Sequence, residues 1–393
     1  MAQSGRTKAD SVGKGEPTPL HRSIHDALTR DIAEGVYRPG DRLPSEAQLC
    51  DRFSASRITV AKAIQALQRE GLVTRRAGSG TYVQTPATGQ RHQFGLLIPQ
   101  LGSTEIFEPI CQGIMRAPLA KSHVLLWGYA PGEGDIDSDY TGKMAEQLCR
   151  QFIDQKVSGV FFAPLEYTVD REAANRRIVD MLSRAGIPVV LLDRCLESYP
   201  KRSEYDLVGI DNHRAGYVVT EHLWQTGARR IAFVARKRSA STIVERIAGY
   251  QFALSELAPA QGQCPSSRVF LGDVNDPDFL GELLRGDRPD AVVCGNDLTA
   301  ARLMRALLDK GLTIPGDLRI ASFDDVTYSK FLPVPLTTVR QECSEIGRAA
   351  LSLMLERLRE PDRPGWEVRV PFELIVRHSS GPTSDDDPSV TRA

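Results

Sequence analysis

The pattern of apolar and polar positions near the N-terminus predicts two helices. From Leu20 onward, apolar residues recur every three or four positions until Gly35, which is typical of an amphipathic helix that ends there. After a turn, Ser45 precedes a second, shorter helix that ends near Phe53. Gln48 stands three positions after Ser45, the spacing at which a serine and a glutamine close a capping box.

A third helix and a hairpin complete this region. Ser56 is a suitable cap, and the apolar positions that follow keep the spacing of a buried stripe: Val60, Ala63, Ile64 and Leu67. Gly71 suits the left-handed position that ends a helix. Residues 72–76 and 81–83 are β-prone and flank Ala-Gly-Ser-Gly, which favours a hairpin. Three helices and a hairpin predict a winged helix-turn-helix at residues 19–83.

The rest of the chain has a different pattern. Short apolar runs alternate with amphipathic stretches of helical length, which is typical of parallel strands buried on both faces. The runs lie at residues 94–99, 123–129, 157–164, 187–193, 207–211, 229–235, 290–296 and 318–324. We therefore expect an α/β region at 94–379, large enough for two doubly wound lobes. Residues 84–93 are predicted to be a linker, and residues 1–18 and 380–393 to be disordered.

Charge is divided unevenly along the chain. Residues 1–91 carry 14 Lys+Arg and 9 Asp+Glu, whereas the remaining residues carry 35 and 41. Between Arg52 and Arg76 there are six cations and a single anion, Glu70. A solvated surface would explain such a run. A basic module that meets a polyanion explains it better, because the rest of the chain is acidic.

Several classes of protein are excluded by the sequence. The seven cysteines are scattered singly and repeat no metal-ligand spacing, so we expect no metal and no cofactor. There is neither an apolar stretch of membrane-spanning length nor a signal peptide, which favours the cytoplasm. Because G-x-S-x-G, Walker A and H-E-x-x-H are all absent, we expect no enzyme.

The basic region carries the motifs P-G-D-R-L-P-S-E, S-R-x-T-V and G-S-G-T. With these motifs it resembles, from end to end, the DNA-binding domain of the GntR family of bacterial transcription regulators. Ala61 departs from the resemblance, because relatives usually carry arginine there. The operator sequence therefore cannot be copied from relatives.

The residue types agree with binding to double-stranded DNA. At the start of the third helix, Arg57 suits a bidentate bond to guanine and Ile58 suits a thymine methyl. Gly78 and Gly80 would let the hairpin enter the minor groove. The residues expected at DNA are Arg42, Ser45, Arg52, Ser56, Arg57, Ile58, Thr59, Lys62, Arg75, Arg76, Gly78 and Gly80. Arg42 and Arg52 have an alternative role, pairing with a nearby acid.

The larger region resembles the ligand-binding core of the LacI family over roughly residues 94–379. The resemblance rests on the ordered runs GIPVVLLDR, VGIDNHRAGYVVTEHLWQTGARRIAFV, PDAVVCGND, GLTIPGDLRIASFDD and PLTTVRQ. It implies a fold like that of periplasmic sugar-binding proteins, with the effector bound between two lobes.

Polar residues at the ends of predicted strands suit such a site, because open α/β sheets bind ligands there. Asp193, Asn296 and Asp324 occupy such ends, and Phe107 would cover a sugar ring. The resemblance implies an effector pocket lined by Asp193, Thr242, Arg246, Asn296, Asp324 and Gln341. Three alternatives stay open: Asp193 and Arg246 form an interlobe ion pair, Phe107 belongs to the core, and Asp297 and Asp325 serve as helix caps.

The sequence therefore predicts a homodimeric transcription regulator, a repressor that binds operator DNA and responds to a small molecule, a monosaccharide. Within the same class, an activator or a nucleobase sensor is the alternative. From another class, the alternative is a cytosolic sugar-binding protein that does not read DNA.

Overall fold

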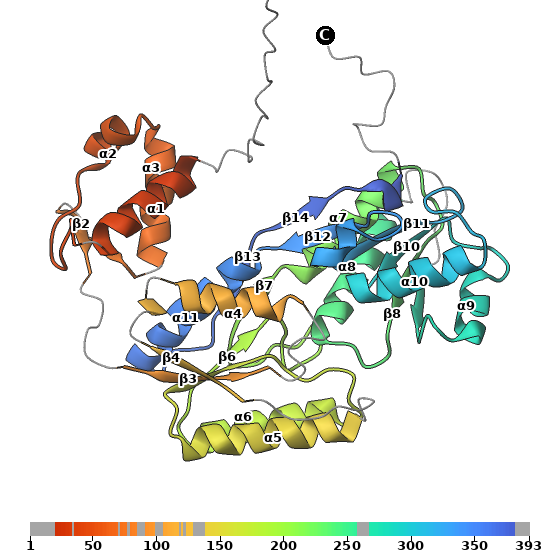
Figure 1. The fold of residues 1–393 in the computed structure, drawn as a ribbon, viewed down its shortest axis with the longest axis horizontal. Coiled ribbons are helices and arrows are strands. Elements are labelled where there is room, and N and C mark those ends of the chain that lie inside the picture. The colour runs from red at the N-terminus through yellow and green to blue at the C-terminus, as the bar shows by residue number, and fades with distance from the viewer. Residues whose placement is uncertain are drawn as a thin grey trace, which may run out of the picture. The chain divides into compact units, whose positions relative to one another are not determined.

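The computed structural model describes residues 20–33, 35–69, 71–76, 79–84, 91–98, 105–117, 119–120, 123–128, 138–257 and 267–381. The chain divides into two units, Met1–Gly89 and Gln90–Ala393, and the division lies within the expected linker. Residues 1–18, residues 382–393 and most of that linker lie outside the described residues. The prediction of disorder from residue 380 is wrong at its start, because Ser380 is buried in the 3₁₀ turn His378–Ser380, where its hydroxyl lies 2.8 Å from His222 Nε2. Figure 1 shows both units.

The N-terminal unit contains α1 (Leu20–Ala33), α2 (Glu46–Phe53) and α3 (Arg57–Arg69), followed by an antiparallel pair, β1 (Val73–Arg76) and β2 (Gly80–Val83). Its core includes Ile24, Leu28 and Leu49, together with the predicted stripe of α3. The predicted capping box at α2 is confirmed, because the Ser45 N–H donates to Gln48 Oε1 and the Gln48 N–H donates to Ser45 Oγ. These are the elements of a winged helix-turn-helix.

A third segment, residues 41–43, pairs with the β1–β2 hairpin, which is the wing of this unit. The Leu43 N–H donates to the Thr81 carbonyl and the Val83 N–H donates to the Asp41 carbonyl, both at 2.8 Å. A β-bridge also joins Arg42 to Tyr82. The turn before α2 is therefore fixed to the hairpin by backbone hydrogen bonds, and the wing has a defined place within its own unit.

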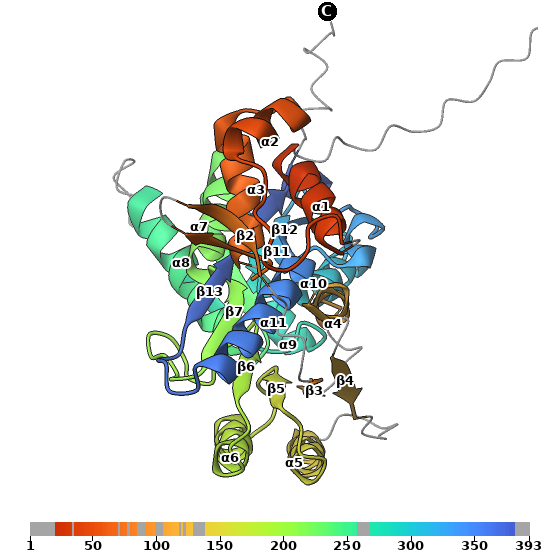
Figure 2. The same ribbon diagram turned by 90° about the vertical axis from the view of Figure 1, so that its left-hand side faces the viewer.

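The larger unit has two six-stranded sheets, and each defines a lobe. The N-lobe sheet has the order β13-β7-β6-β5-β3-β4 and is parallel throughout. Its strands are β3 (Gln93–Leu97), β4 (Val124–Trp127), β5 (Gly159–Phe162), β6 (Val189–Leu192), β7 (Asp206–Ile210) and β13 (Glu367–Val370). In Figures 1 and 2, α5 (Ser138–Asp154) and α6 (Arg171–Arg184) cover one face. The other face packs against α4 (Phe107–Arg116) and α11 (Cys343–Arg359).

The C-lobe sheet has the order β14-β12-β11-β10-β8-β9, with β14 antiparallel to its neighbour. Its strands are β8 (Ile231–Ala235), β9 (Arg268–Leu271), β10 (Ala291–Cys294), β11 (Arg319–Asp324), β12 (Thr337–Gln341) and β14 (Phe372–Ile375). One face packs against α9 (Pro277–Leu284) and α10 (Asp297–Asp309). The other packs against α7 (Asn212–Gln225) and α8 (Ser241–Leu257), and short 3₁₀ turns lie at Thr327–Lys330 and His378–Ser380.

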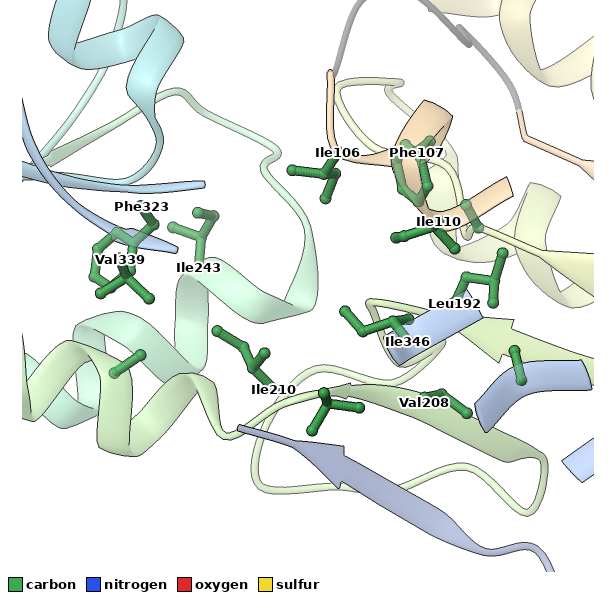
Figure 3. Packing of buried hydrophobic residues seen from close by; sticks show 14 of the residues in the cluster. Ile106, Phe107, Ile110, Leu192, Val208, Ile210, Ile243, Phe323, Val339 and Ile346 are labelled. Carbon is green, nitrogen blue, oxygen red and sulfur yellow. The ribbon is translucent and has the colours of Figure 1, made fainter. Parts of the chain in front are cut away.

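The chain passes between the lobes three times, from β7 to α7, from β12 to α11 and from β13 to β14. A single cluster of buried apolar residues extends across these passages. Figure 3 shows part of it, with Phe323, Val339 and Ile243 from the C-lobe and Phe107, Leu192 and Ile346 from the N-lobe. The doubly wound, two-lobed fold is confirmed. None of the described helices is long and apolar enough to cross a lipid bilayer.

Candidate DNA-binding surface and effector site

The start of α3 presents the side chains expected to read DNA. The Thr59 N–H donates to Ser56 Oγ at 3.2 Å, and the two hydroxyl oxygens lie 2.8 Å apart, so Ser56 caps the helix. Ile58 is 71% exposed although it is apolar, and Arg57 and Lys62 are exposed beside it. Neither cation forms an ion pair with a described residue. Both are therefore available to an anionic partner.

Two of the predicted DNA contacts have acidic partners within the protein. Arg52 Nη2 lies 2.7 Å from Asp31 Oδ2, and Arg52 Nη1 donates to the Tyr37 hydroxyl at 3.2 Å. The hydrogen bond to Asp31 raises the pKa of Arg52. Arg75 Nη2 lies 3.3 Å from Glu46 Oε1 and stays well exposed. Arg52 thus joins α2 to α1, which is the alternative that the sequence left open.

The wing residues have structural roles of their own. Gly80 has φ +124°, and a Cβ there would lie 2.6 Å from Arg42 Nε, so Arg42 packs against this glycine. The guanidinium of Arg76 lies 4.8 Å from the centre of the Tyr82 ring. Gly78 lies outside the described residues.

Two aspartates of the expected effector site stand on strained backbone at strand ends. Asp193 follows β6 with φ +67°, and Asp324 ends β11 with φ +114°. Positive φ costs free energy for any residue other than glycine, and such strain gathers at ligand sites. Asp193 and Asp324, which the sequence pattern placed at strand ends, are therefore unusual in backbone conformation as well as in charge.

Arg246, Asp324 and Gln341 lie together in the C-lobe. Arg246 Nη2 lies 3.6 Å from Asp324 Oδ1, and Gln341 Nε2 donates to the same oxygen at 2.9 Å. Arg246 also donates to Asn212 Oδ1 and to the Gly295 carbonyl, each at 2.8 Å, and its side chain is 3% exposed. Burial raises the pKa of Asp324 to about 6, although the Arg246 charge opposes this.

Asp193 belongs to a second charged group, in the N-lobe. Arg194 Nη1 lies 2.8 Å from Glu166 Oε1, and Arg194 Nε lies 3.4 Å from Asp193 Oδ2. Burial raises the pKa of Asp193, while the guanidiniums of Arg194 and Arg246 lower it. The two groups are therefore electrostatic neighbours across the lobes. The ion pair of Arg246 is with Asp324 of its own lobe and not with Asp193.

Two oxygen atoms in these groups have no hydrogen-bond partner among the described residues: Asp193 Oδ1 and Gln341 Oε1. Their residues are only 5% and 4% exposed. A buried acceptor without a donor costs about 1–3 kcal/mol, so buried polar groups are nearly always paired. Orphaned acceptors at the predicted effector site, one in each lobe, are what a ligand that donates hydrogen bonds would satisfy.

The other predicted effector residues lie nearby. Asn296 Nδ2 lies 3.5 Å from the Tyr167 hydroxyl, which belongs to the N-lobe, and Thr242 is buried in the first turn of α8. Phe107 is 3% exposed within the apolar cluster, and the Arg194 guanidinium lies 5.1 Å from its ring centre. The ring therefore packs in the core and touches the site through Arg194.

The helix caps differ from the prediction. Asn296 caps α10, because its Oδ1 accepts from the Thr299 N–H at 2.9 Å. Asp297 instead accepts from the Val326 N–H and the Thr338 hydroxyl, and burial together with nearby Asp324 raises its pKa to about 8. Asp325 is paired with Arg340 and Arg377. The sequence shows the Asn-Asp and Asp-Asp pairs but not which residue of each accepts from the backbone N–H groups of a helix.

Sequence reasoning missed Arg194 and Glu166. Arg194 had a signal, since it directly follows Asp193 at the end of a predicted strand. Glu166 stands in a loop with no local pattern. A surface cavity of about 740 Å³ lies elsewhere, between α6 and residues 196–205, and contains no predicted site residue. Within the described residues, no His, Cys, Asp and Glu side chains are grouped to hold a metal ion.

Comparison with known families and proteins gives a separate family match for each of the two units. Residues 20–83 match the family of bacterial regulatory proteins of the gntR type, and residues 220–380 match the periplasmic binding protein-like domain. An arabinose metabolism transcriptional repressor from Geobacillus stearothermophilus is 27% identical and covers 93% of this chain and 99% of its own length. The transcriptional repressor PurR of Mannheimia succiniciproducens is 30% identical over 62% of this chain and 69% of its own.

A solved structure agrees in fold. The transcription regulator CcpA of Lactococcus lactis superposes with a TM-score of 0.60 at 23% identity. The match covers 74% of this chain and 99% of that one.

Proposed function

This chain belongs to the bacterial transcription regulators that combine a GntR-family DNA-binding domain with a periplasmic-binding-protein-like effector domain, and we propose that it is a cytoplasmic repressor whose hold on operator DNA is controlled by a small sugar. The observation that carries the proposal is the pair of acceptors, Asp193 Oδ1 and Gln341 Oε1, that have no donor among the described residues, in a protein whose α3 exposes Arg57 and Lys62. The likeness to an arabinose metabolism repressor over nearly the whole chain supports it.

DNA binding is assigned to the exposed face of α3 and to the wing. Arg57 and Ile58 would meet base edges in the major groove, while Lys62, Arg75 and Arg76 would hold phosphates. The hydroxyls of Ser56 and Thr59 bond to each other, so their share in DNA binding is to shape the helix start. A single winged helix buries little surface, and we propose a homodimer that binds a near-palindromic operator.

Control of DNA binding is assigned to the two lobes. A sugar that donates hydroxyl protons to Asp193 in the N-lobe and to Gln341 in the C-lobe would hold the lobes in one relative position. The effect on the operator can be no larger than the difference in sugar affinity between the two states of the protein. No covalent chemistry is required, and we assign no enzymatic activity.

Operator binding with and without sugars tests the proposal. The full-length protein should bind a promoter fragment from upstream of its own gene or its neighbours, as measured by fluorescence anisotropy, and a sugar should lower that affinity. Failure to bind any such fragment would contradict the DNA-binding role. Binding that only a nucleobase releases would retain the repressor and reject the sugar, and tighter binding with sugar would reject release as the mode of control.

A further inference from the structure

The charge balance of the effector site points to the chemical class of the effector, and the argument rests on the proposed function. The two neighbouring groups contain three buried carboxylates, of Glu166, Asp193 and Asp324, and two buried guanidiniums, of Arg194 and Arg246. The two groups therefore have no surplus of positive charge. A buried phosphate or carboxylate needs such a surplus, because an uncompensated buried anion is very costly.

Both guanidiniums also already bind acceptor groups of the protein. Arg194 contacts the carboxylates of Glu166 and Asp193 and the Pro164 carbonyl. Arg246 contacts Asp324, Asn212 and the Gly295 carbonyl. An anionic ligand would have to break these contacts inside the protein, where each lost charge pair leaves a buried carboxylate alone.

The groups that remain without partners are acceptors. Asp193 Oδ1 and Gln341 Oε1 are both more than nine-tenths buried, and no described residue donates to either. Only a donor can satisfy them. A sugar hydroxyl is such a donor, whereas an ionised phosphate or carboxylate group has only acceptor oxygens and cannot itself satisfy either atom.

We infer that the site is built for a neutral, hydroxyl-rich effector, whose hydroxyls donate to Asp193 and Gln341, and that it rejects phosphorylated and carboxylated sugars. Outside the two groups, Arg236 is a cation close to the site, because it stacks on Tyr167, whose hydroxyl lies 3.5 Å from Asn296 Nδ2. Its guanidinium lies 4.2 Å from the centre of the Tyr167 ring and forms no ion pair with a described residue.

A matched ligand panel tests this class. Thermal unfolding of the full-length protein is followed with neutral sugars (L-arabinose, D-ribose, D-glucose, D-galactose, sorbitol and cellobiose), with charged counterparts (ribose 5-phosphate, glucose 6-phosphate and galacturonate) and with adenine and guanine. A ligand that binds only the folded state raises the melting temperature. We expect a shift from at least one neutral member, and none from its charged counterpart at the same concentration.

Substitutions at Asp193 and Gln341 test whether these two acceptors bind the sugar. Asp193→Asn keeps the shape and tolerates positive φ, but its amide presents N–H donors in place of one carboxylate oxygen. It should lower affinity for the neutral sugar at least about tenfold. Gln341→Met removes the second acceptor and should have an effect of the same direction. Asp309→Asn, which changes an exposed carboxylate on α10, is the control and should leave sugar affinity unchanged. Operator binding by each variant checks that it is folded.

Each outcome decides between the two proposals. A charged sugar that binds as well as its neutral parent, and that loses affinity in Arg236→Ala, overturns the inference and leaves a sugar-responsive repressor. A response to adenine or guanine alone, or to no member of the panel, contradicts the sugar assignment and this inference with it. Unchanged sugar affinity in both Asp193→Asn and Gln341→Met overturns the inferred role of the two acceptors.

Discussion

The DNA-binding unit and the effector lobes arrange their charges in opposite ways. In the first, Arg57 and Lys62, which we propose to contact DNA, lie on the surface and form no ion pair with a described residue. In the second, Arg194 and Arg246 are almost wholly buried and each meets carboxylates of the protein. Exposed cations suit a polyanion that arrives from solvent, whereas buried charges that are paired within the protein suit a small neutral ligand.

This difference predicts that ionic strength changes the affinity for operator DNA strongly and the affinity for sugar hardly at all. Exposed cations release counterions from DNA, so operator affinity should fall by about 10³-fold or more between 50 and 200 mM salt, if two heads make roughly six or more phosphate contacts. Sugar affinity should change little over the same range, because buried pairs are weakly screened. Anisotropy and calorimetric titrations measure the two. A sugar affinity that fell as steeply as DNA affinity would remove the contrast.

Burial also predicts which arginine substitution lowers the free energy of unfolding more. Arg246→Ala leaves Asp324 without its buried cation and takes a donor from Asn212, so it should lower the free energy of unfolding by about 3–5 kcal/mol without any sugar. Arg305→Ala, which breaks an exposed pair with Asp309, is the matched control and should cost under about 1 kcal/mol. Urea unfolding of the full-length proteins measures both. Normal stability with lost sugar response would make Arg246 a ligand contact alone.

The two units also differ in how far sequence alone predicts them. The capping box, the buried stripe of α3 and the hairpin are all formed by residues close in sequence, and they were predicted. Eight strands of the lobes were predicted as well, because the seven central strands among them and the edge strand β4 all have continuous apolar runs. The strands β9, β12, β13 and β14 were missed, since they are polar or lie at sheet edges, such as the Glu-Val-Arg-Val of β13.

Local sequence patterns do not predict contacts between residues that are far apart in the sequence. The pairing of Arg52 with Asp31, of Arg246 with Asp324 and of Arg194 with Glu166 joins residues 21, 78 and 28 positions apart. Each pair depends on which strands and helices the fold brings together. The sequence located the strand ends, but not the partner of each charge.

Within the DNA-binding unit, position separates a base contact from a phosphate contact. Arg57→Ala should cost about 1–3 kcal/mol on the preferred operator and flatten the preference at one base pair, because a bidentate contact to a base is lost. Arg76→Ala should weaken all sequences about equally, since phosphates carry no sequence. Anisotropy on an operator and on single-base variants measures both. Equal losses on every sequence would show that Arg57 does not read bases.

The smallest expected effect belongs to Arg52, which shares the basic run with Arg57 but has a partner. Its pair with Asp31 is partly exposed, so Arg52→Ala should cost only about 0.2–1 kcal/mol of stability. If the pair persists on DNA, operator affinity should fall less than in Arg76→Ala. A double-mutant cycle with Asp31→Ala isolates the coupling between the two residues. If Arg52→Ala instead weakened DNA binding as much as Arg76→Ala, with no coupling to Asp31, the guanidinium would have left α1 for a phosphate. The charge run would then act on DNA as a whole, and the pair with Asp31 would not set Arg52 apart from the other cations.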